Sequence, residues 1–494
     1  MPDHTNTKVK SIKVRMYKTG TGDFFLLQFK KTKNSHFCML IDCGSIHGSK
    51  EDLAPAIEDL HDVTDGTIDL LVVTHEHADH MNGFQKCAAE FKTIDVKKVW
   101  LAWTESDTTY ANEFRKKYSE VKLALHKATE QLKKFSEDGS IQNLYEKEYM
   151  GKLMMEANTF FIDSLVELNQ LNGMDNTLSL DDIPTMVDKL KSYNVINDET
   201  VVSFFEPGQL VENLENLVGI RFYILGPPLS NTSIRKKEVK GEGYEKRETK
   251  SYIDRAFLNV FDQTASDPEV HNPFDAKYES LENHPELDKR TATLESMYRN
   301  ESWRTIDHEW LLSAGNLALR HQTSINNTSL VIAIQIIDSE KILLFPGDAE
   351  HGSWLSWHDG LEWSIKDKND NIQKVNAEYI LNHTVFYKVS HHLSQNGTPS
   401  QKGLEMMTQE DLTAMVTLDL NSILPKWRNT MPNDLIGEIL IEKTKGKVFF
   451  AGDRTRILNN LKTDRVTISR GLIDKVHKNH EQFDDKVYVE CEIP

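Results

Sequence analysis

Apolar and polar positions alternate in short runs over several separate parts of the chain. Runs of this kind, broken by Gly, Pro, Asn and Ser, predict β-strands joined by turns. They fall at residues 9–43, 201–230, 328–348, 412–420 and 446–453. One apolar run, Ile68–Val73, predicts a buried strand, and residues 51–63 have helical spacing. The pattern therefore predicts a sheet-rich core with helices between the strands.

Two long stretches interrupt this pattern. Residues 108–200 carry Leu, Met and Ala at helical spacing with little Gly or Pro, which predicts amphipathic helices. Residues 231–322 are highly charged, with one helical section near 283–320. Because 494 residues exceed what one core usually supports, we interpret both stretches as insertions. The core then comprises three segments: 1–107, 201–230 and 323–494.

The segment Thr74–His80 directly follows the apolar run and holds three imidazoles and two carboxylates in seven residues. Side chains at the carboxyl end of a strand are placed where α/β folds keep their chemistry. His75 and His77 are two positions apart, so they share a face in extended backbone. Asp79 and His80 follow where the chain can turn. Imidazole and carboxylate are common ligands of zinc, iron and manganese, so the segment predicts a centre with two neighbouring metal ions.

The pattern His75-x-His77-x-Asp79-His80 resembles the signature of the metallo-β-lactamase superfamily, and further landmarks occur in the expected order. They are the turn Asp42–Gly44, the strand end before Asp348, and the pair His391-His392. The resemblance implies an α/β (α+β) protein, a four-layered αββα sandwich with large helical insertions. In that fold 1–107 and 323–494 form its two halves, and 201–230 adds strands.

Further segments are similar to the ComEC-type branch of this superfamily. They include Thr19–Leu27, Tyr223–Pro228 and Asn326–Val331. ComEC-type domains are associated with DNA uptake and regarded as nucleases, so the resemblance implies phosphodiester hydrolysis. It covers roughly 260 to 300 residues, in pieces. Full ComEC proteins are membrane channels, so this chain is expected to be a relative without the channel part.

The resemblance also implies a set of site residues. Metal one is expected on His75, His77 and Asp348, and metal two on Asp79, His80, Asp348 and His391. Asp79, His80 and Asp348 are the expected catalytic residues. Supporting or substrate-contacting roles are expected for four others: Asp42, Asn327, Lys388 and His392.

The sequence departs from many hydrolases of the superfamily at one position. Where these supply a third His to the first metal, this chain has Asn326-Asn327-Thr328-Ser329. An amide oxygen is a harder and weaker ligand than imidazole, which shifts the choice of ion toward Mn²⁺ or Mg²⁺. We still expect two divalent ions with Zn²⁺ first.

Composition bears on partners and location. No apolar run approaches the ~20 residues that span a bilayer, and the N-terminus lacks an apolar signal region, so we expect a cytoplasmic protein without membrane contact. The four cysteines form no CxxC pair, which excludes a zinc ribbon or disulfide framework. The net charge of −18 argues mildly against sequence-independent nucleic-acid binding. The densest basic stretch, Arg235–Lys250, is the best candidate for holding an anionic substrate if it lies over the metal site.

Three functions stay open from the sequence. The first is a phosphodiesterase or nuclease acting on a nucleic acid or nucleotide, with a metal-bridging hydroxide as nucleophile. The second is hydrolysis of a carboxylic ester, lactone, lactam or thioester on the same dinuclear site. The third is a non-catalytic or partner-activated protein, since the insertions 108–200 and 231–322 suit a protein partner or a second copy of the chain.

Overall fold

The structure, a computed structural model, describes residues 8–32, 35–137, 184–236, 242–243, 323–367, 371–423, 431–461 and 468–494. The chain divides into two compact units. One comprises Met1–Arg115, Ile183–Lys246 and Thr323–Pro494, and the other comprises Lys116–Asp182 and Arg247–Gln322. Residues 184–200 thus belong with the core, whereas the sequence grouped them with the first insertion. The helical section near 283–320 lies outside the described residues, and binding of a partner through the insertions stays a prediction.

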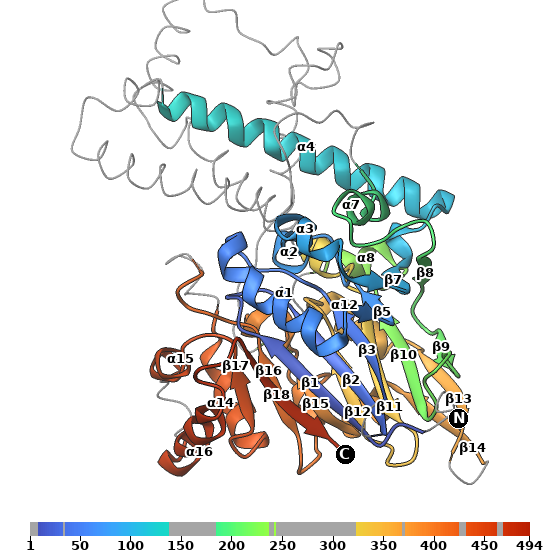
Figure 1. Cartoon of the computed structure of the whole chain (residues 1–494), viewed down its shortest axis with the longest axis vertical. Coiled ribbons are helices and arrows are strands. Elements are labelled where there is room, and N and C mark those ends of the chain that lie inside the picture. Colours follow the sequence, from blue (N-terminus) through green and yellow to red (C-terminus); the bar gives the residue numbers. More distant parts are fainter. Residues whose placement is uncertain are drawn as a thin grey trace, which may run out of the picture. The chain divides into compact units, whose positions relative to one another are not determined.

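The first sheet of the core has seven strands in the order β18-β1-β2-β3-β5-β7-β8 (Figure 1). Neighbours from β18 to β3 are antiparallel, and neighbours from β3 to β8 are parallel. The alternation over 9–43 therefore does form an antiparallel meander. The strands are β1 (Ser11–Tyr17), β2 (Phe25–Thr32), β3 (Ser35–Ile41), β5 (Leu70–Val72), β7 (Lys98–Ala102), β8 (Val201–Phe205) and β18 (Tyr488–Ile493).

The second sheet repeats this division between antiparallel and parallel strands. Its order is β17-β16-β15-β12-β11-β10-β9, parallel from β17 to β12 and antiparallel from β12 to β9. The strands are β9 (Leu210–Glu212), β10 (Ile220–Gly226), β11 (Val331–Ile336), β12 (Ile342–Phe345), β15 (Thr384–Lys388), β16 (Thr413–Val416) and β17 (Val448–Phe450). Two small ribbons pair β4 (Thr67–Ile68) with β6 (Asp95–Val96) and β13 (Glu362–Lys366) with β14 (Ile372–Asn376).

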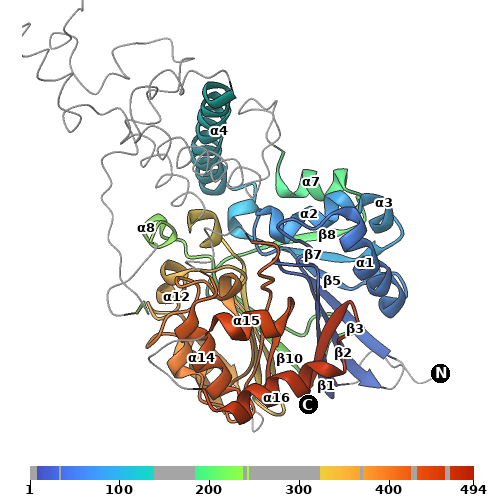
Figure 2. The ribbon, with the colours of Figure 1, turned by 90° about the vertical axis from the view of Figure 1, so that its left-hand side faces the viewer.

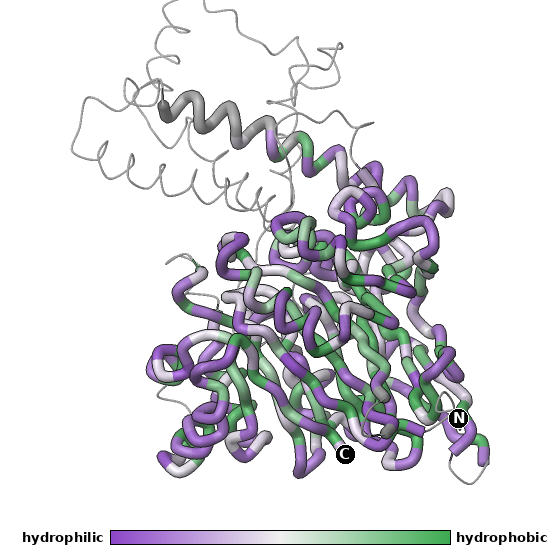
Figure 3. Tube along the Cα trace, in the orientation of Figure 1, coloured by the Kyte–Doolittle hydropathy of each residue, from purple (hydrophilic) through white to green (hydrophobic). Residues whose placement is uncertain are grey.

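The two large sheets pack face to face through aromatic and aliphatic side chains. The rings of Phe25 in β2 and Phe345 in β12 lie 5.8 Å apart, and those of Phe29 and Phe222 lie 6.4 Å apart. Because side chains alternate along a strand, each sheet also has an outer apolar face that must be covered. Apolar residues are accordingly concentrated along the strands, and polar residues are frequent along the outer helices and loops (Figure 3).

Helices cover both outer faces (Figure 2). On the first sheet lie α1 (Lys50–Thr64), α2 (Ala78–Lys86), α3 (Ala88–Phe91) and α7 (Met186–Ser192). On the second lie α12 (His351–Trp357), α13 (Ala377–Asn382), α14 (Asp434–Lys443), α15 (Arg454–Asn460) and α16 (Arg470–Glu481). The remaining described α-helices are α4 (Thr109–Glu137) and α8 (Asn231–Ile234). The predicted mixed α/β class is confirmed.

Helix α1 shows how local sequence sets an element's bounds. Ser49 caps it, accepting from the amide of Asp52, while the Asp52 carboxylate accepts from the amide of Ser49. This reciprocal capping box satisfies two amides that the first turn leaves without partners. The helix ends where Asp65 adopts φ +49°. The predicted helix at 51–63 is therefore present, slightly extended at both ends.

In the part of the chain that is described, no helix combines the length and apolar character needed to cross a membrane. The four cysteines are free thiols, and Cys38, Cys43 and Cys87 are buried.

His480 is expected to make folding depend on pH. Its Nε2 accepts from the amide of Phe450 at 2.9 Å and its Nδ1 faces the carbonyl of Val476 at 2.8 Å, which requires a neutral ring. Burial lowers the pKa of His480 to about 4. The unfolded chain therefore takes up a proton below its pKa of about 6.5 while the folded chain does not. The stabilisation is complete above that pH and is lost as pH falls toward 4, by up to about 3 kcal/mol.

Urea unfolding of His480→Gln at several pH values checks this expectation. A glutamine accepts the same amide but does not titrate, so the variant should lose part of the acid-side slope of unfolding free energy against pH. Identical slopes in both proteins would contradict it.

Candidate metal centre

Five parallel strands of the two sheets deliver their carboxyl ends to one place. In the first sheet β3 leads into Asp42, and β5 leads into Thr74 and the histidine segment. In the second sheet β12 leads into Asp348, while β15 and β16 lead into the His392 turn and Thr417. Short connections at such an edge leave side chains free to converge. The polar residues singled out in the sequence are thus brought together from both sheets.

Helix α2 begins inside the histidine segment. His77 is its N-cap residue, with φ −62° and ψ 149°, and Asp79 and His80 lie in its first turn. The turn expected from the sequence at Asp79 and His80 is thus the first turn of a helix. A carboxylate in the first turn is favoured by the positive end of the helix dipole. This start places Asp79 and His80 on a helix, whereas His77 is in extended backbone and His75 precedes the helix.

Asp42 holds this segment from behind. Its Oδ1 accepts from the amide of Thr74 at 2.7 Å and its Oδ2 accepts from the Thr74 hydroxyl at 2.6 Å. The same Oδ2 lies 2.8 Å from Nδ1 of His80. This contact assigns the ring proton to Nδ1 and leaves Nε2 directed at the centre, as second-layer carboxylates do for metal-bound imidazoles. Asp42 lies where the sequence placed it.

Gly44 is expected to tolerate no side chain. A methyl group there would overlap the backbone of Asp79 and His80. Gly44→Ala should therefore displace the first turn of α2 and weaken metal binding roughly 10- to 100-fold, as loss of other supporting contacts does. Gly471→Ala in α16 is the matched control, because nothing lies within 4 Å of its added methyl. Equal metal affinity in both variants would contradict the expectation.

His75 and His77 face one another, with Nε2 of His75 3.0 Å from Nδ1 of His77. The other nitrogen of His75, Nδ1, lies 3.1 Å from the hydroxyl of Thr74 and 3.3 Å from that of Ser329. The two hydroxyl groups fix the ring by its outer edge. Its inner nitrogen and that of His77 are then spaced as two ligands of one ion would be.

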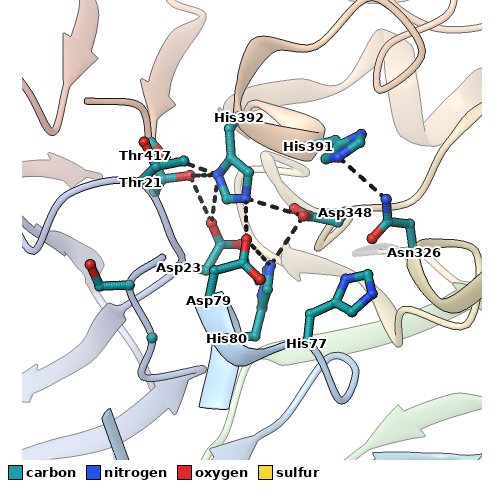
Figure 4. Close-up of polar contacts among 12 residues, drawn as sticks. Thr21, Asp23, His77, Asp79, His80, Asn326, Asp348, His391, His392 and Thr417 are labelled. Carbon is teal, nitrogen blue, oxygen red and sulfur yellow. Dashed lines mark hydrogen bonds and ion pairs between the residues drawn. The ribbon is translucent and has the colours of Figure 1, made fainter. Parts of the chain in front are cut away.

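A second group of ligand atoms lies at the middle of the site (Figure 4). Nε2 of His392 is 3.0 Å from Oδ2 of Asp79 and 3.1 Å from Oδ2 of Asp348. Nε2 of His80 is 3.2 Å from the same Asp348 oxygen and 3.9 Å from the Asp79 oxygen. Atoms bound to a tetrahedral zinc at 2.0–2.2 Å lie about 3.3–3.6 Å apart. The spacing therefore fits the shell of one metal ion.

Distance alone also groups Asp23 with His80, Asp348 and His392, since one ligand atom of each lies within 4.8 Å of the others. This buried group could hold a metal ion. Asp23, however, accepts from the Thr417 hydroxyl at 2.7 Å and pairs with Nζ of Lys388 at 2.5 Å. Its carboxylate is already committed to other partners. We therefore regard Asp23 as a support of the centre and Asp79 as the better ligand.

The centre carries buried polar atoms that the protein leaves unsatisfied. Among the described residues, Oδ1 of Asp79 and Nε2 of both His77 and His80 have no aligned hydrogen-bond partner, and none of these three atoms is accessible. Buried polar atoms are nearly always paired. Such atoms on neighbouring ligands are what a cation site provides for the ion.

The pKa shifts of the buried residues also favour a cation at the centre. Burial disfavours an ionised His80, yet the surrounding aspartates outweigh it and raise the pKa of His80 well above its usual value. The same balance raises the pKa of His392 to about 9. Burial would raise the pKa of Asp79, but His80 and His392 lower it to about 2. The aspartates thus attract positive charge, which a metal ion or ring protons supply.

His391 and His392 exchange the places that the sequence gave them. His391, expected as a ligand, has Nε2 3.3 Å from Nδ2 of Asn326 and Nδ1 3.5 Å from Oε1 of Glu350. His392, expected beside the site, lies between Asp79 and Asp348. The cause is a turn in which His391, His392 and Leu393 have φ of 47°, 51° and 67°. Consecutive left-handed residues are unfavourable in conformational free energy, and no feature of the sequence predicts them.

Lys388 and Asn327 lie in supporting positions, one of the two roles expected for them. The Nζ of Lys388 is buried and bonded to the carbonyl of Gly347 at 2.8 Å and to Asp348 and Asp23. Asn327 donates from Nδ2 to the carbonyls of Ile234 and Lys236, and its Oδ1 accepts from the amides of Glu350 and Ser353. Both side chains hold the fold around the centre.

Neither a scan of protein-family models nor a search of curated proteins finds a match for this chain. The fold and the cluster by themselves define its class: a mixed α/β protein with a buried group of aspartates and histidines suited to a metal ion.

Proposed function

We propose that this protein is a metal-dependent hydrolase of the metallo-β-lactamase type that cleaves phosphodiesters. The observation that carries the proposal is the spacing of four inward-facing atoms, from Asp79, His80, Asp348 and His392, near that of one coordination shell. The His75–His77 pair beside them supports a second ion that would share Asp348. The resemblance found in the sequence supplies the family.

The arrangement of the sheets supports the αββα sandwich as the fold type. Two facing sheets, each half antiparallel and half parallel, carry helices on their outer faces. The ligands come from the carboxyl ends of parallel strands in both sheets, as two similar halves joined at one edge would place them.

The residues present fit two divalent ions, with zinc first because four of the six proposed ligands are imidazoles. Such ions supply Lewis-acid chemistry, lowering the pKa of a water molecule and withdrawing charge from a phosphoryl or carbonyl oxygen. The chain's own residues hold and orient the ligand side chains. Asp42 fixes the ring of His80, the Thr74 and Ser329 hydroxyls fix that of His75, and Lys388 fixes Asp348. Preorganised ligands of this kind require little rearrangement during reaction.

An anionic substrate is favoured by the charges beside the centre. Arg235 and Lys236 are exposed at the end of α8, and the carbonyl of Lys236 accepts from Asn327, which also bonds the amide of Glu350 close to Asp348. They begin the basic stretch singled out in the sequence. Local positive charge can attract a phosphate despite a net charge of −18.

Cleavage of labelled single- and double-stranded DNA and RNA, with zinc, manganese and magnesium tested separately, examines the proposal. Asp348→Asn should lose more than the roughly 10- to 100-fold typical of a supporting residue. Asp338→Asn makes the same chemical change at an exposed ion pair and should stay active.

Activity lost in Asp348→Asn and kept in Asp338→Asn would support a metallonuclease and exclude a contaminating enzyme. Cleavage that survives in Asp348→Asn would contradict the proposal. Metal-loaded protein that leaves every polymer intact but hydrolyses an ester, lactone or thioester would establish acyl hydrolysis in its place.

A further inference from the structure

Tyr110, at the start of α4, exposes an aromatic ring near the metal centre. The described residues contain four exposed large hydrophobic side chains, and two of them, Tyr110 at 49% and Leu229 at 47%, lie together. The Tyr110 hydroxyl donates to the carbonyl of Leu229 at 2.8 Å. Exposed apolar residues that cluster are more informative than scattered ones.

The ring of Tyr110 is held in one orientation. It stacks on Trp103 with centroids 5.1 Å apart and planes 18° apart. Trp103 is itself buried, packs against Phe114 at 5.5 Å and donates from Nε1 to the carbonyl of Pro227 at 3.1 Å. Trp103 covers one face of the Tyr110 ring, and 49% of the residue remains exposed. A rigid aromatic face loses little conformational entropy when a flat ligand stacks on it.

Two independent connections place Trp103, on which this ring stacks, at the edge of the sheet that carries the ligands. Strands β5 and β7 are parallel neighbours with Val72 opposite Trp100. Trp103 begins the 3-10 turn directly after β7, and Thr74 and His75 follow β5 at the same edge. On the other side, Pro227 follows Gly226, which packs against Ser329. The Ser329 hydroxyl lies 3.3 Å from Nδ1 of His75. Trp103 and Pro227, which hold the Tyr110 ring and the neighbouring loop, therefore leave the two sheets at the edge where the first metal ligands lie.

We propose that Tyr110 is a stacking platform for a nucleobase of the substrate whose phosphodiester lies at the metal centre. The proposal rests on the proposed function and narrows its substrate to one with an accessible base, such as a single strand or a nucleotide. Stacking is sequence-tolerant because every base has a π-face. The exposed Arg235 and Lys236, six and seven residues after Leu229, add positive charge for the sugar–phosphate backbone.

Binding measured without cleavage tests the platform independently of catalysis. Wild type, Tyr110→Phe and Tyr110→Leu, all loaded with metal, are titrated with a short non-hydrolysable oligonucleotide containing 2-aminopurine and with an abasic non-hydrolysable oligonucleotide of equal length. Phenylalanine keeps the ring, whereas leucine keeps only apolar bulk. Tyr110→Leu should bind the base-containing strand roughly 5- to 150-fold more weakly, the range for loss of one stacked base. All three proteins should bind the abasic strand equally.

Base-containing strands bound equally by wild type and Tyr110→Leu, or not bound at all, would overturn the platform. Equal unfolding curves for the three proteins exclude a folding defect as the cause of a difference. Cleavage by the metal-loaded wild type is measured separately. Weaker binding of the base-containing strand by Tyr110→Leu, without any cleavage by wild type, would support the platform and contradict the proposed function. Cleavage by wild type without that difference in binding would support the proposed function and contradict the platform.

Discussion

Replacing His392 by alanine is expected to remove metal binding and hydrolysis together, while His391→Ala has a much smaller effect. His392 contributes the nitrogen that lies 3.0 Å from Asp79 and 3.1 Å from Asp348. Its outer nitrogen is fixed by the carbonyl and hydroxyl of Thr417 at 3.0 and 2.9 Å. The His392→Ala change removes one of the four ligand groups around this position. It also leaves the buried carboxylates of Asp79 and Asp348 without the imidazole that pairs with them.

His391 is a natural control because it is the adjacent residue with the same side chain. It contacts Asn326 and Glu350, so its loss should resemble loss of a supporting residue, roughly 10- to 100-fold in metal affinity or activity. The metal content and the cleavage rate of the two variants test which of the two histidines is the metal ligand. If His391→Ala lost the metal and His392→Ala kept it, the assignment from sequence would be right and the turn described above would be wrong.

Replacing Lys388 by methionine is expected to cause the largest loss of stability among single changes around the centre. The Lys388 ammonium is buried between Asp23 and Asp348 at 2.5 and 3.2 Å. Burial disfavours its charge, but the two carboxylates outweigh this and raise the pKa of Lys388. Removing one partner of a buried charge group typically costs about 3–5 kcal/mol, because the other charges stay buried without compensation.

Chemical denaturation of metal-free Lys388→Met measures this loss. Lys8→Met is the matched control, because Lys8 pairs with Asp338 at an exposed site where such pairs contribute about 0–1 kcal/mol. Divalent metal should restore part of the stability of Lys388→Met by neutralising Asp348. An unfolding free energy equal to that of wild type would contradict the electrostatic role given to Lys388.

The sequence was sufficient for many of the strands and for most of the metal segment, but β13, β14, β15 and β18 lie outside the runs that it predicts. Alternating apolar positions set the antiparallel half of the first sheet, and the apolar run before Thr74 set the strand that carries His75 and His77. These succeed because a strand's side-chain period and its burial are local properties. The position of Asp42 behind His80 followed from the turn after β3.

What the sequence did not determine depends on backbone geometry and on contacts between distant strands. His391 and His392 are chemically identical, and only the left-handed turn decides which ring enters the centre. Asp23 precedes β2 and meets Lys388 and Thr417 only because the sheets pack against each other. The signal for Asp23 was present in the segment Thr19–Leu27, but a lone carboxylate before a strand gave no reason to assign it to the site.

Metal content per protein chain is the measurement that tests the central claim most directly. Protein purified and dialysed against zinc, then analysed by mass spectrometry of its metals, is predicted to hold close to two ions per chain. His392→Ala should hold clearly less. Wild-type protein that binds no divalent metal, or that binds as much as His392→Ala does, would contradict a metal centre built on Asp79, His80, Asp348 and His392.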